Sequence, residues 1–124
     1  MIIGIGTDII SVSRISKAMQ NNERMAERLF TPSEIAYCEA KSSKWQSYAA
    51  RFAAKEAVMK ALGTGWDGEV NWKDIEIVND ANGNPDVLLS GGAKKKADEL
   101  GLSHAHISLT HEKDYAIAFA ILEA

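Results

Sequence analysis

One run of the sequence, residues 51–65, constrains the fold most, because it is typical of a long helix that carries charged groups on an apolar background. At helical spacing Arg51 and Lys55 form one charged row, and Glu56 and Lys60 form a second. An apolar sector beside these rows would bury well. Its members are Ala50, Ala54, Ala57, Val58 and Ala61. The sequence therefore predicts a long helix with two charged rows and a buried apolar sector, which ends at glycine.

Glu56 occupies an unusual place for a carboxylate. On a helix it falls on a second side, beside Ala49, Phe52 and Met59. A surface ion pair with Lys60, worth about 0.3–0.5 kcal/mol, is the ordinary interpretation. A partly apolar setting instead suggests a functional carboxylate.

The first nine residues form a short apolar run of strand type that carries an acid, Asp8, near its end. If strand alternation persists, Asp8 shares a face with Gly4 and Gly6. The glycines leave room beside the carboxylate for a ligand or for another backbone. Two carboxylates on different elements, Asp8 and Glu56, suit a hard cation.

The rest of the pattern separates helices from strands. Helices are predicted from Ser11 or Ser13 to about Gln20, from Pro32 to about Ala40 behind the capping box of Thr31 and Glu34, from about Trp45 to Leu62, and over residues 92–100. Strands are predicted over residues 75–78, 87–89, 106–110 and 115–122, as two hairpins. Because the two types segregate, an α+β fold is favoured over a doubly wound fold.

Composition limits the classes of function. With 124 residues and 46% hydrophobic content, one compact domain over residues 1–124 is expected. The net charge of -3 provides no basic field for nucleic acid. Cys38 is the single cysteine, which excludes an internal disulfide framework and fits a reducing compartment. No basic leader or long apolar run is present, so we expect a cytoplasmic protein without a membrane span.

Motifs throughout the chain resemble those of the holo-acyl-carrier-protein synthase family, the small phosphopantetheinyl transferases. The matching segments are Gly4 to Ile9, Arg51 to Ala57, Lys60 to Gly65, Trp72 to Ile77, Asn82 to Pro85, Ile107 to His111, and Tyr115 with Ala116. They span nearly the whole chain and follow the family's order and spacing. A chance match to all of them is very improbable.

The resemblance implies an activity and an assembly. The activity is Mg2+-dependent transfer of the 4'-phosphopantetheine arm of coenzyme A to a serine of apo acyl carrier protein, which releases adenosine 3',5'-bisphosphate and supports fatty acid biosynthesis. The implied fold is an antiparallel sheet with helices packed on it. The implied assembly is a homotrimer with coenzyme A at the subunit interfaces, for which the apolar strand from Tyr115 to Ile121 is the expected contact.

The resemblance also assigns roles to residues. Asp8 and Glu56 are the expected metal ligands, and Lys60 the group that stabilises charge on a phosphate. The base that deprotonates the serine could be Glu56, Asp8 or a metal-held water. The expected coenzyme A contacts are Arg51, Lys55, Lys60, Gly63, Pro85, Thr110 and His111. For Arg51 and Lys55 the alternative is a pair of solvated surface cations.

An acidic carrier protein requires a basic docking surface. Its candidates are Arg14, Lys17, Arg24 and Arg28. By resemblance Arg14 is the best of these, while an ordinary mixed-charge helix remains the alternative for the other three.

The sequence also allows other interpretations. A dinucleotide site is disfavoured because Ile9 replaces the third glycine of its fingerprint. His104, His106 and His111 could form a zinc cluster, but a polar rim is the favoured reading. Competing functions are a binding module for coenzyme A or the carrier, without chemistry, and a structural oligomerisation domain. Residues 66–68 form a loop whose only assigned role is that of an aromatic cover.

Overall fold

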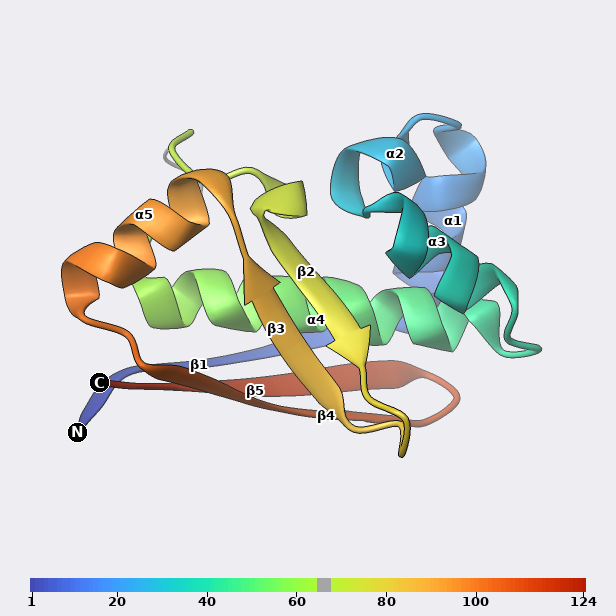
Figure 1. The fold of residues 1–124 in the computed structure, drawn as a ribbon. Coiled ribbons are helices and arrows are strands. Elements are labelled where there is room, and N and C mark those ends of the chain that lie inside the picture. The colour runs from blue at the N-terminus through green and yellow to red at the C-terminus, as the bar shows by residue number, and fades with distance from the viewer. Residues whose placement is uncertain (65–67) are drawn as a thin grey trace.

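A long helix lying across an antiparallel sheet forms the centre of the molecule (Figure 1). The computed structural model describes residues 1–64 and 68–124. The three-stranded sheet has the order β1 (Ile2–Ser11), β5 (Tyr115–Glu123), β4 (His104–His111), and the helix is α4 (Lys44–Leu62). The predicted α+β class is confirmed.

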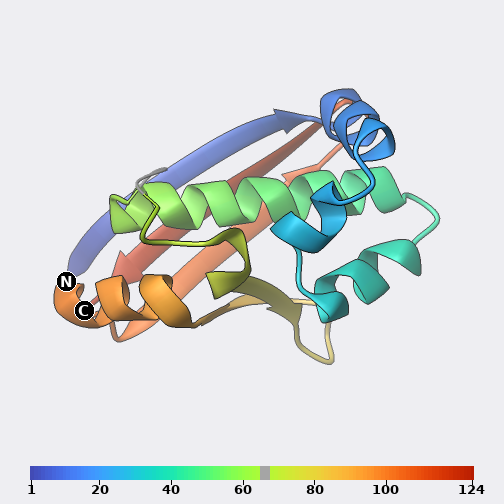
Figure 2. The same ribbon diagram turned by 90° about the horizontal axis from the view of Figure 1, so that it is seen from above.

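Smaller elements surround this centre. In chain order they are α1 (Val12–Asn21), α2 (Met25–Leu29), α3 (Pro32–Glu39), the short 3-10 helix η1 (Trp72–Asp74), β2 (Ile75–Asn79), β3 (Pro85–Leu89) and α5 (Gly91–Leu100). Figure 2 shows α1, α2 and α3 gathered around the N-terminal end of α4. The β2–β3 hairpin is a separate two-stranded antiparallel sheet.

Local capping residues predicted most helix ends correctly. Ser11 caps α1 by accepting a hydrogen bond from the backbone of Arg14 at 3.4 Å. At the start of α3, Thr31 and Glu34 form the predicted reciprocal capping box. Helix α4 ends at Gly63, whose φ of 75° is the left-handed conformation that glycine adopts without a Cβ penalty.

Long-range pairing was not predicted from the sequence. Strand β1 pairs along its length with β5, so the first and last strands of the chain lie side by side, and the amino group of Met1 donates to the carbonyl of Ala124 at 3.2 Å. Helix α2 was also missed, because its five residues are too few to show a helical period.

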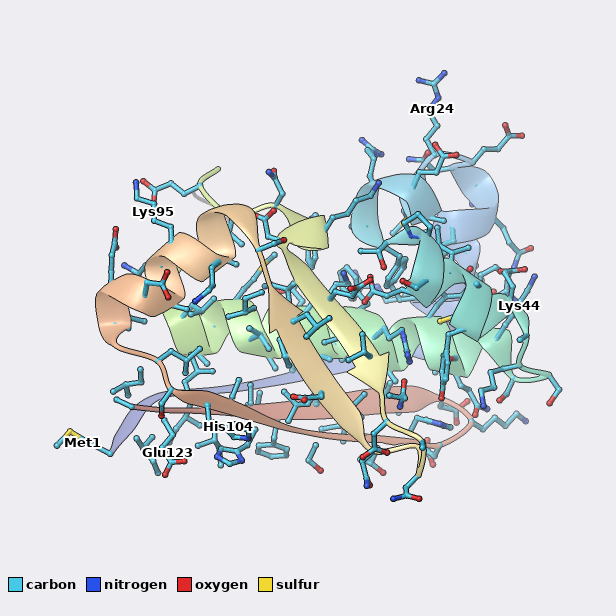
Figure 3. The ribbon with its side chains drawn as sticks, in the orientation of Figure 1. Met1, Arg24, Lys44, Lys95, His104 and Glu123 are labelled. Atoms are coloured by element: carbon cyan, nitrogen blue, oxygen red, sulfur yellow. The ribbon has the colours of Figure 1, made fainter. Side chains whose placement is uncertain are left out.

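The two faces of the sheet differ in the size of their side chains. On β5 the residues that face α4 are all buried, namely Ala116, Ala118, Ala120 and Leu122. The opposite face presents large apolar side chains to solvent. We call these the outer apolar face: Ile5, Ile9, Tyr115, Phe119 and Ile121. Figure 3 shows His104 and Glu123 on this same side of the sheet, away from α4.

Two glycines in β1 let α4 approach the strand closely. A Cβ on Gly6 would overlap the carbonyl oxygen of Ala57, and one on Gly4 would overlap that of Ala61. Of the two expected neighbours for these glycines, a ligand or another backbone, the structure shows the backbone. Since side chains alternate along a strand, Asp8 faces α4 as well.

We expect Gly6→Ala to lower the free energy of unfolding by about 1–3 kcal/mol or more, because neither backbone at this contact can move without disturbing the sheet or the helix. Urea denaturation measures the change. Gly83→Ala is the control, because its φ of 84° imposes backbone strain of about 1–2 kcal/mol but a Cβ there meets open space, so Gly6→Ala should be the more destabilising of the two. A Gly6→Ala protein as stable as the wild type would contradict the close contact.

Candidate active site

Asp8 and Lys60 meet where β1 crosses the second half of α4. Lys60 Nζ lies 3.1 Å from Asp8 Oδ1 and also donates to the carbonyl of Thr7 at 2.9 Å. The alternative prediction, an ordinary ion pair between Glu56 and Lys60, is not found among the described residues. Asp8 is mostly buried while Lys60 is half-exposed, so the amine is free to turn toward a ligand at the surface.

Glu56 is half-buried one turn before Lys60 on α4. Its burial raises the pKa of its carboxyl above the ordinary 4.5, the negative charge of Asp8 raises it further, and Lys60 partly opposes the shift. Asp8 Oδ2 is itself buried and has no hydrogen-bond partner among the described residues. Two carboxylates that repel each other, one with an unpaired buried oxygen, form a site that a cation would stabilise.

The donor set of this site fits a hard divalent cation. Mg2+ takes oxygen ligands and commonly only one or two protein carboxylates, with water and substrate phosphates completing its shell. Asp8 and Glu56 supply two such carboxylates. Within residues 1–64 and 68–124, no group of three histidine, cysteine or carboxylate side chains is arranged to hold a metal. Of the three histidines considered as a zinc cluster, His104 and His106 have ring centres 4.3 Å apart. His106 Nε2 lies 3.0 Å from Glu123 Oε1, so this histidine pairs with a carboxylate.

The raised pKa of Glu56 predicts how stability depends on pH. A carboxyl whose pKa is higher in the folded state binds its proton more tightly there, so its contribution favours folding below the unfolded pKa and is lost as the pH rises through the folded pKa. At neutral pH and without metal, we therefore expect Glu56→Gln to unfold at a higher urea concentration than the wild type. The gap should close in acid, and a less stable variant at neutral pH would contradict this explanation.

A second cluster lies beside the first half of α4. Arg51, Pro85 and His111, all predicted to contact coenzyme A, line one cavity of about 180 Å³. The other lining residues are Tyr37, Ser47, Ala50, Asn79, Gly83 and Leu109. These residues come from α3, α4, the β2–β3 hairpin and β4, so only the tertiary fold assembles the cavity.

The remaining predicted coenzyme A contacts lie around these clusters. Thr110 is exposed next to His111, and both line a neighbouring cavity of about 220 Å³ that also includes Ile9 and Tyr115. Gly63 is exposed at the end of α4, near the Lys60 cluster. Of the loop predicted at residues 66–68, residues 66 and 67 lie outside the described residues, so its role as an aromatic cover stays a prediction.

The prediction that Lys55 contacts coenzyme A is wrong. Its side chain is 0% exposed and its Nζ lies 2.7 Å from Glu34 Oε1. The same nitrogen donates to the carbonyls of Trp72 at 3.0 Å and Ile75 at 2.6 Å. Burial lowers the pKa of Lys55, and the charge of Glu34 partly opposes this shift. Lys55 therefore joins α4 to α3 and β2 inside the protein and is not a surface cation.

Sequence reasoning also missed Glu34 as the partner of Lys55. Glu34 was identified only as a capping residue, and it does accept from the backbone of Thr31 at 2.9 Å. Its other carboxylate oxygen accepts from the backbone of Ile77 at 2.9 Å. A lysine next to the apolar sector of α4 was the one available signal, and nothing local indicated which acid would neutralise it.

The two clusters lie at opposite edges of the sheet. Asp8 is on β1 and His111 is on β4, with β5 between them (Figure 1). On α4, Lys60 turns to Asp8, whereas Arg51 turns to Asn79 on the β2–β3 hairpin. Within one chain the two clusters therefore do not form a single site.

The predicted carrier-binding residues all lie on the α1–α2 side of the molecule, and all are exposed: Arg14, Lys17, Arg24 and Arg28. Figure 3 shows Arg24 projecting from the turn between these helices, away from the sheet. Arg14 lines a mostly apolar cavity of about 260 Å³ together with Ile9, Ala18, Met25 and Phe52. A basic group at the mouth of an apolar cavity sets Arg14 apart from the other three.

Comparison with known proteins identifies the family. Residues 4–120 match the model of the 4'-phosphopantetheinyl transferase superfamily. A holo-[acyl-carrier-protein] synthase of Solibacter usitatus is 45% identical over 124 residues, which cover 99% of each chain. The chain belongs to the holo-acyl-carrier-protein synthase family. The resemblance drawn from the motifs is thereby confirmed.

Solved structures of this family share the fold. The holo-[acyl-carrier-protein] synthase of Neisseria meningitidis superimposes with a TM-score of 0.91 at 38% identity, covering 100% of both chains. The Helicobacter pylori synthase, solved in complex with coenzyme A, has a TM-score of 0.84 at 35% identity over 96% of this chain and 99% of that one. In the described part of this family member, no helix is long and apolar enough to cross a bilayer.

Proposed function

We propose that this protein transfers the 4'-phosphopantetheine group of coenzyme A to a serine hydroxyl of apo acyl carrier protein and so supports fatty acid biosynthesis. The observation that carries the proposal is the pair of mutually repelling carboxylates, Asp8 and Glu56, beside Lys60 in a member of this family. Relatives across the whole chain are named holo-[acyl-carrier-protein] synthase, and related structures hold coenzyme A.

In this reaction the serine oxygen forms a bond to the β-phosphorus of coenzyme A. The pyrophosphate P–O bond breaks, and adenosine 3',5'-bisphosphate leaves with the electron pair while the serine proton passes to a base. Asp8 and Glu56 would hold Mg2+, which supplies neutralisation of the pyrophosphate charge. Lys60 would exchange its contact with Asp8 for a phosphate oxygen and stabilise the charge that develops there.

The nucleotide end of coenzyme A is proposed to bind the cavity of Arg51, Pro85 and His111. Arg51 offers a planar fork of donors suited to a phosphate. Thr110 and Gly63 are proposed as further contacts at the edges of the two clusters. Lys55 is excluded by its burial.

A homotrimer is proposed because one chain cannot join its two clusters. The outer apolar face provides a surface for association, and a protomer that pairs its Asp8 edge with a neighbour's His111 edge would complete the site.

We expect Phe119→Glu to give monomers in light scattering and to lose activity, because a charge would be buried at the interface. Leu88→Glu is the control, since Leu88 is 53% exposed on β3 whereas Phe119 is 52% exposed on the outer apolar face. A Phe119→Glu protein with the wild-type mass would contradict this interface.

Docking of the acidic carrier is proposed at Arg14 on α1, with Lys17, Arg24 and Arg28 adding positive charge. Arg14 is exposed next to an apolar cavity, a combination that suits an amphipathic helix with acidic flanks.

The reaction is proposed for the cytoplasm, where the free buried thiol of Cys38 would stay reduced.

Intact-mass spectrometry of an apo acyl carrier protein tests the function directly. The carrier is incubated with this protein, coenzyme A and Mg2+, and a parallel reaction contains a chelator. We expect the carrier to gain the mass of one phosphopantetheinyl group, and the chelator to prevent the gain. If several carriers gain no mass while coenzyme A still binds, the protein is a binding module and the proposed activity is wrong.

A further inference from the structure

Arg51 is a buried cation to which residues 1–64 and 68–124 supply no counter-ion. Arg51 is only 4% exposed. Among the residues that the structure describes, no carboxylate lies within ion-pair distance of its guanidinium. Its Nε is buried and has no hydrogen-bond partner in the part of the chain that the structure describes. Because an uncompensated buried charge is costly, this arrangement is explained best by an anion that arrives from outside.

Two uncharged side chains hold the guanidinium in place. One terminal nitrogen of Arg51 donates to Asn79 Oδ1 at 2.5 Å. The guanidinium carbon lies 3.9 Å from the centre of the Tyr37 ring, which gives a favourable cation–π contact. Both neighbours stabilise the cation, and neither neutralises it.

Asn79 is itself fixed by the turn that forms one wall of the cavity. It ends β2, it faces Pro85 across the hairpin, and its Nδ2 donates to the carbonyl of Gly83 at 3.0 Å. The amide orientation is therefore set on one side by a backbone carbonyl, so its oxygen must face Arg51. Asn79 links the position of Arg51 to the position of the turn.

Tyr37 approaches Arg51 from α3. Its ring also lies 4.7 Å below the ammonium of Lys41, so one aromatic side chain faces two cations. An aromatic face can orient a guanidinium without donating or accepting the hydrogen bonds that a phosphate needs. The remaining donors of Arg51 thus stay available to a ligand in the cavity.

We propose that Asn79 and Tyr37 are positioning residues that fix the Arg51 guanidinium while preserving its charge for one phosphate group of coenzyme A. This inference rests on the proposed function, since it names how that cavity recognises its substrate. A neutral amide at position 79 is the essential feature. A carboxylate there would make the same contact but would occupy the charge that the phosphate requires.

Asn79→Asp tests the proposal with almost no change of shape. Calorimetric titration with adenosine 3',5'-bisphosphate should show the dissociation constant rising about tenfold or more, because a phosphate must compete with a fixed carboxylate. In the transfer assay KM for coenzyme A should rise while kcat stays nearly constant. Asn82→Asp is the matched control, because it adds the same charge three residues later, at an exposed position of the β2–β3 turn outside the lining of the Arg51 cavity.

A second pair of variants keeps the proposal testable if Asn79→Asp folds poorly. Tyr37→Leu removes the aromatic face and should weaken binding of the bisphosphate several-fold, and Tyr37→Phe should restore most of it. Wild-type binding by both Asn79→Asp and Tyr37→Leu, with an intact transferase, would overturn the positioning roles alone. A wild-type protein that neither binds the bisphosphate nor modifies any carrier would instead overturn the proposed function.

Discussion

Glu56→Gln is expected to lower kcat/KM for carrier modification at least about a hundredfold, because the proposed function assigns this carboxylate to the Mg2+ that neutralises the pyrophosphate. The substitution preserves shape and removes charge. It also removes the two causes that raise the pKa of Glu56, which are the burial of its charge and, second, the repulsion from Asp8. The variant should therefore be an inactive protein that is at least as stable as the wild type. The intact-mass assay, run under single-turnover conditions, measures the loss.

Two controls separate a metal site from a general loss of charge. Asp8→Asn should cause a comparable loss, whereas Glu123→Gln, an exposed glutamate paired with His106, should remain active. If Glu56→Gln or Asp8→Asn retains weak affinity for the metal, a higher Mg2+ concentration should partly restore the transfer activity of that variant. Full activity of Glu56→Gln at low Mg2+ would remove this residue from the proposed mechanism.

Lys55→Met is expected to lower the free energy of unfolding by about 3–5 kcal/mol, because it leaves the carboxylate of Glu34 buried without its cation. For a domain whose total stability is about 5–15 kcal/mol, this is a large fraction. The loss has a second source, since the Lys55 amine also holds the carbonyls of Trp72 and Ile75. Urea denaturation followed by tryptophan fluorescence measures it.

The double variant Glu34→Gln with Lys55→Met tests the reason for that loss. Replacing both members of a buried ion pair with neutral groups is often close to neutral, so the double variant should regain a substantial part of the stability. Glutamine can still accept from the backbone of Thr31 or Ile77. A double variant as unstable as the single one would mean that the cost lies in packing and not in the unpaired charge.

Local signals predicted most elements of this fold. The capping box of Thr31 and Glu34 and the glycine at position 63 act within one turn of the helices they delimit, so a few residues contain the whole cause. The hairpins were predicted for the same reason. The pairing of β1 with β5 joins residues at opposite ends of the chain, and no local pattern specifies such a contact.

At the candidate site, the difference between local and long-range causes explains why Arg51 and Lys55 lie in different surroundings. Both were predicted as cations of one helical row with a shared task, because they are four residues apart. The fold instead places Lys55 against Glu34 inside the core and Arg51 at the wall of a cavity. Helical spacing predicts the direction in which a side chain points. It does not predict which residues of other elements lie in that direction.

The sequence by itself determined the family and the α+β class and predicted Asp8, Glu56 and Lys60 as the chemical groups, because motif, period and capping are encoded by neighbours along the chain. The tertiary structure decided which groups meet: that Lys60 pairs with Asp8, that Arg51 finds no counter-ion in the described part of the chain, and that the two clusters lie on opposite edges of the sheet. The physical reason is that burial and charge pairing depend on distances set by packing. Gly4 and Gly6 create those distances only once α4 lies against β1.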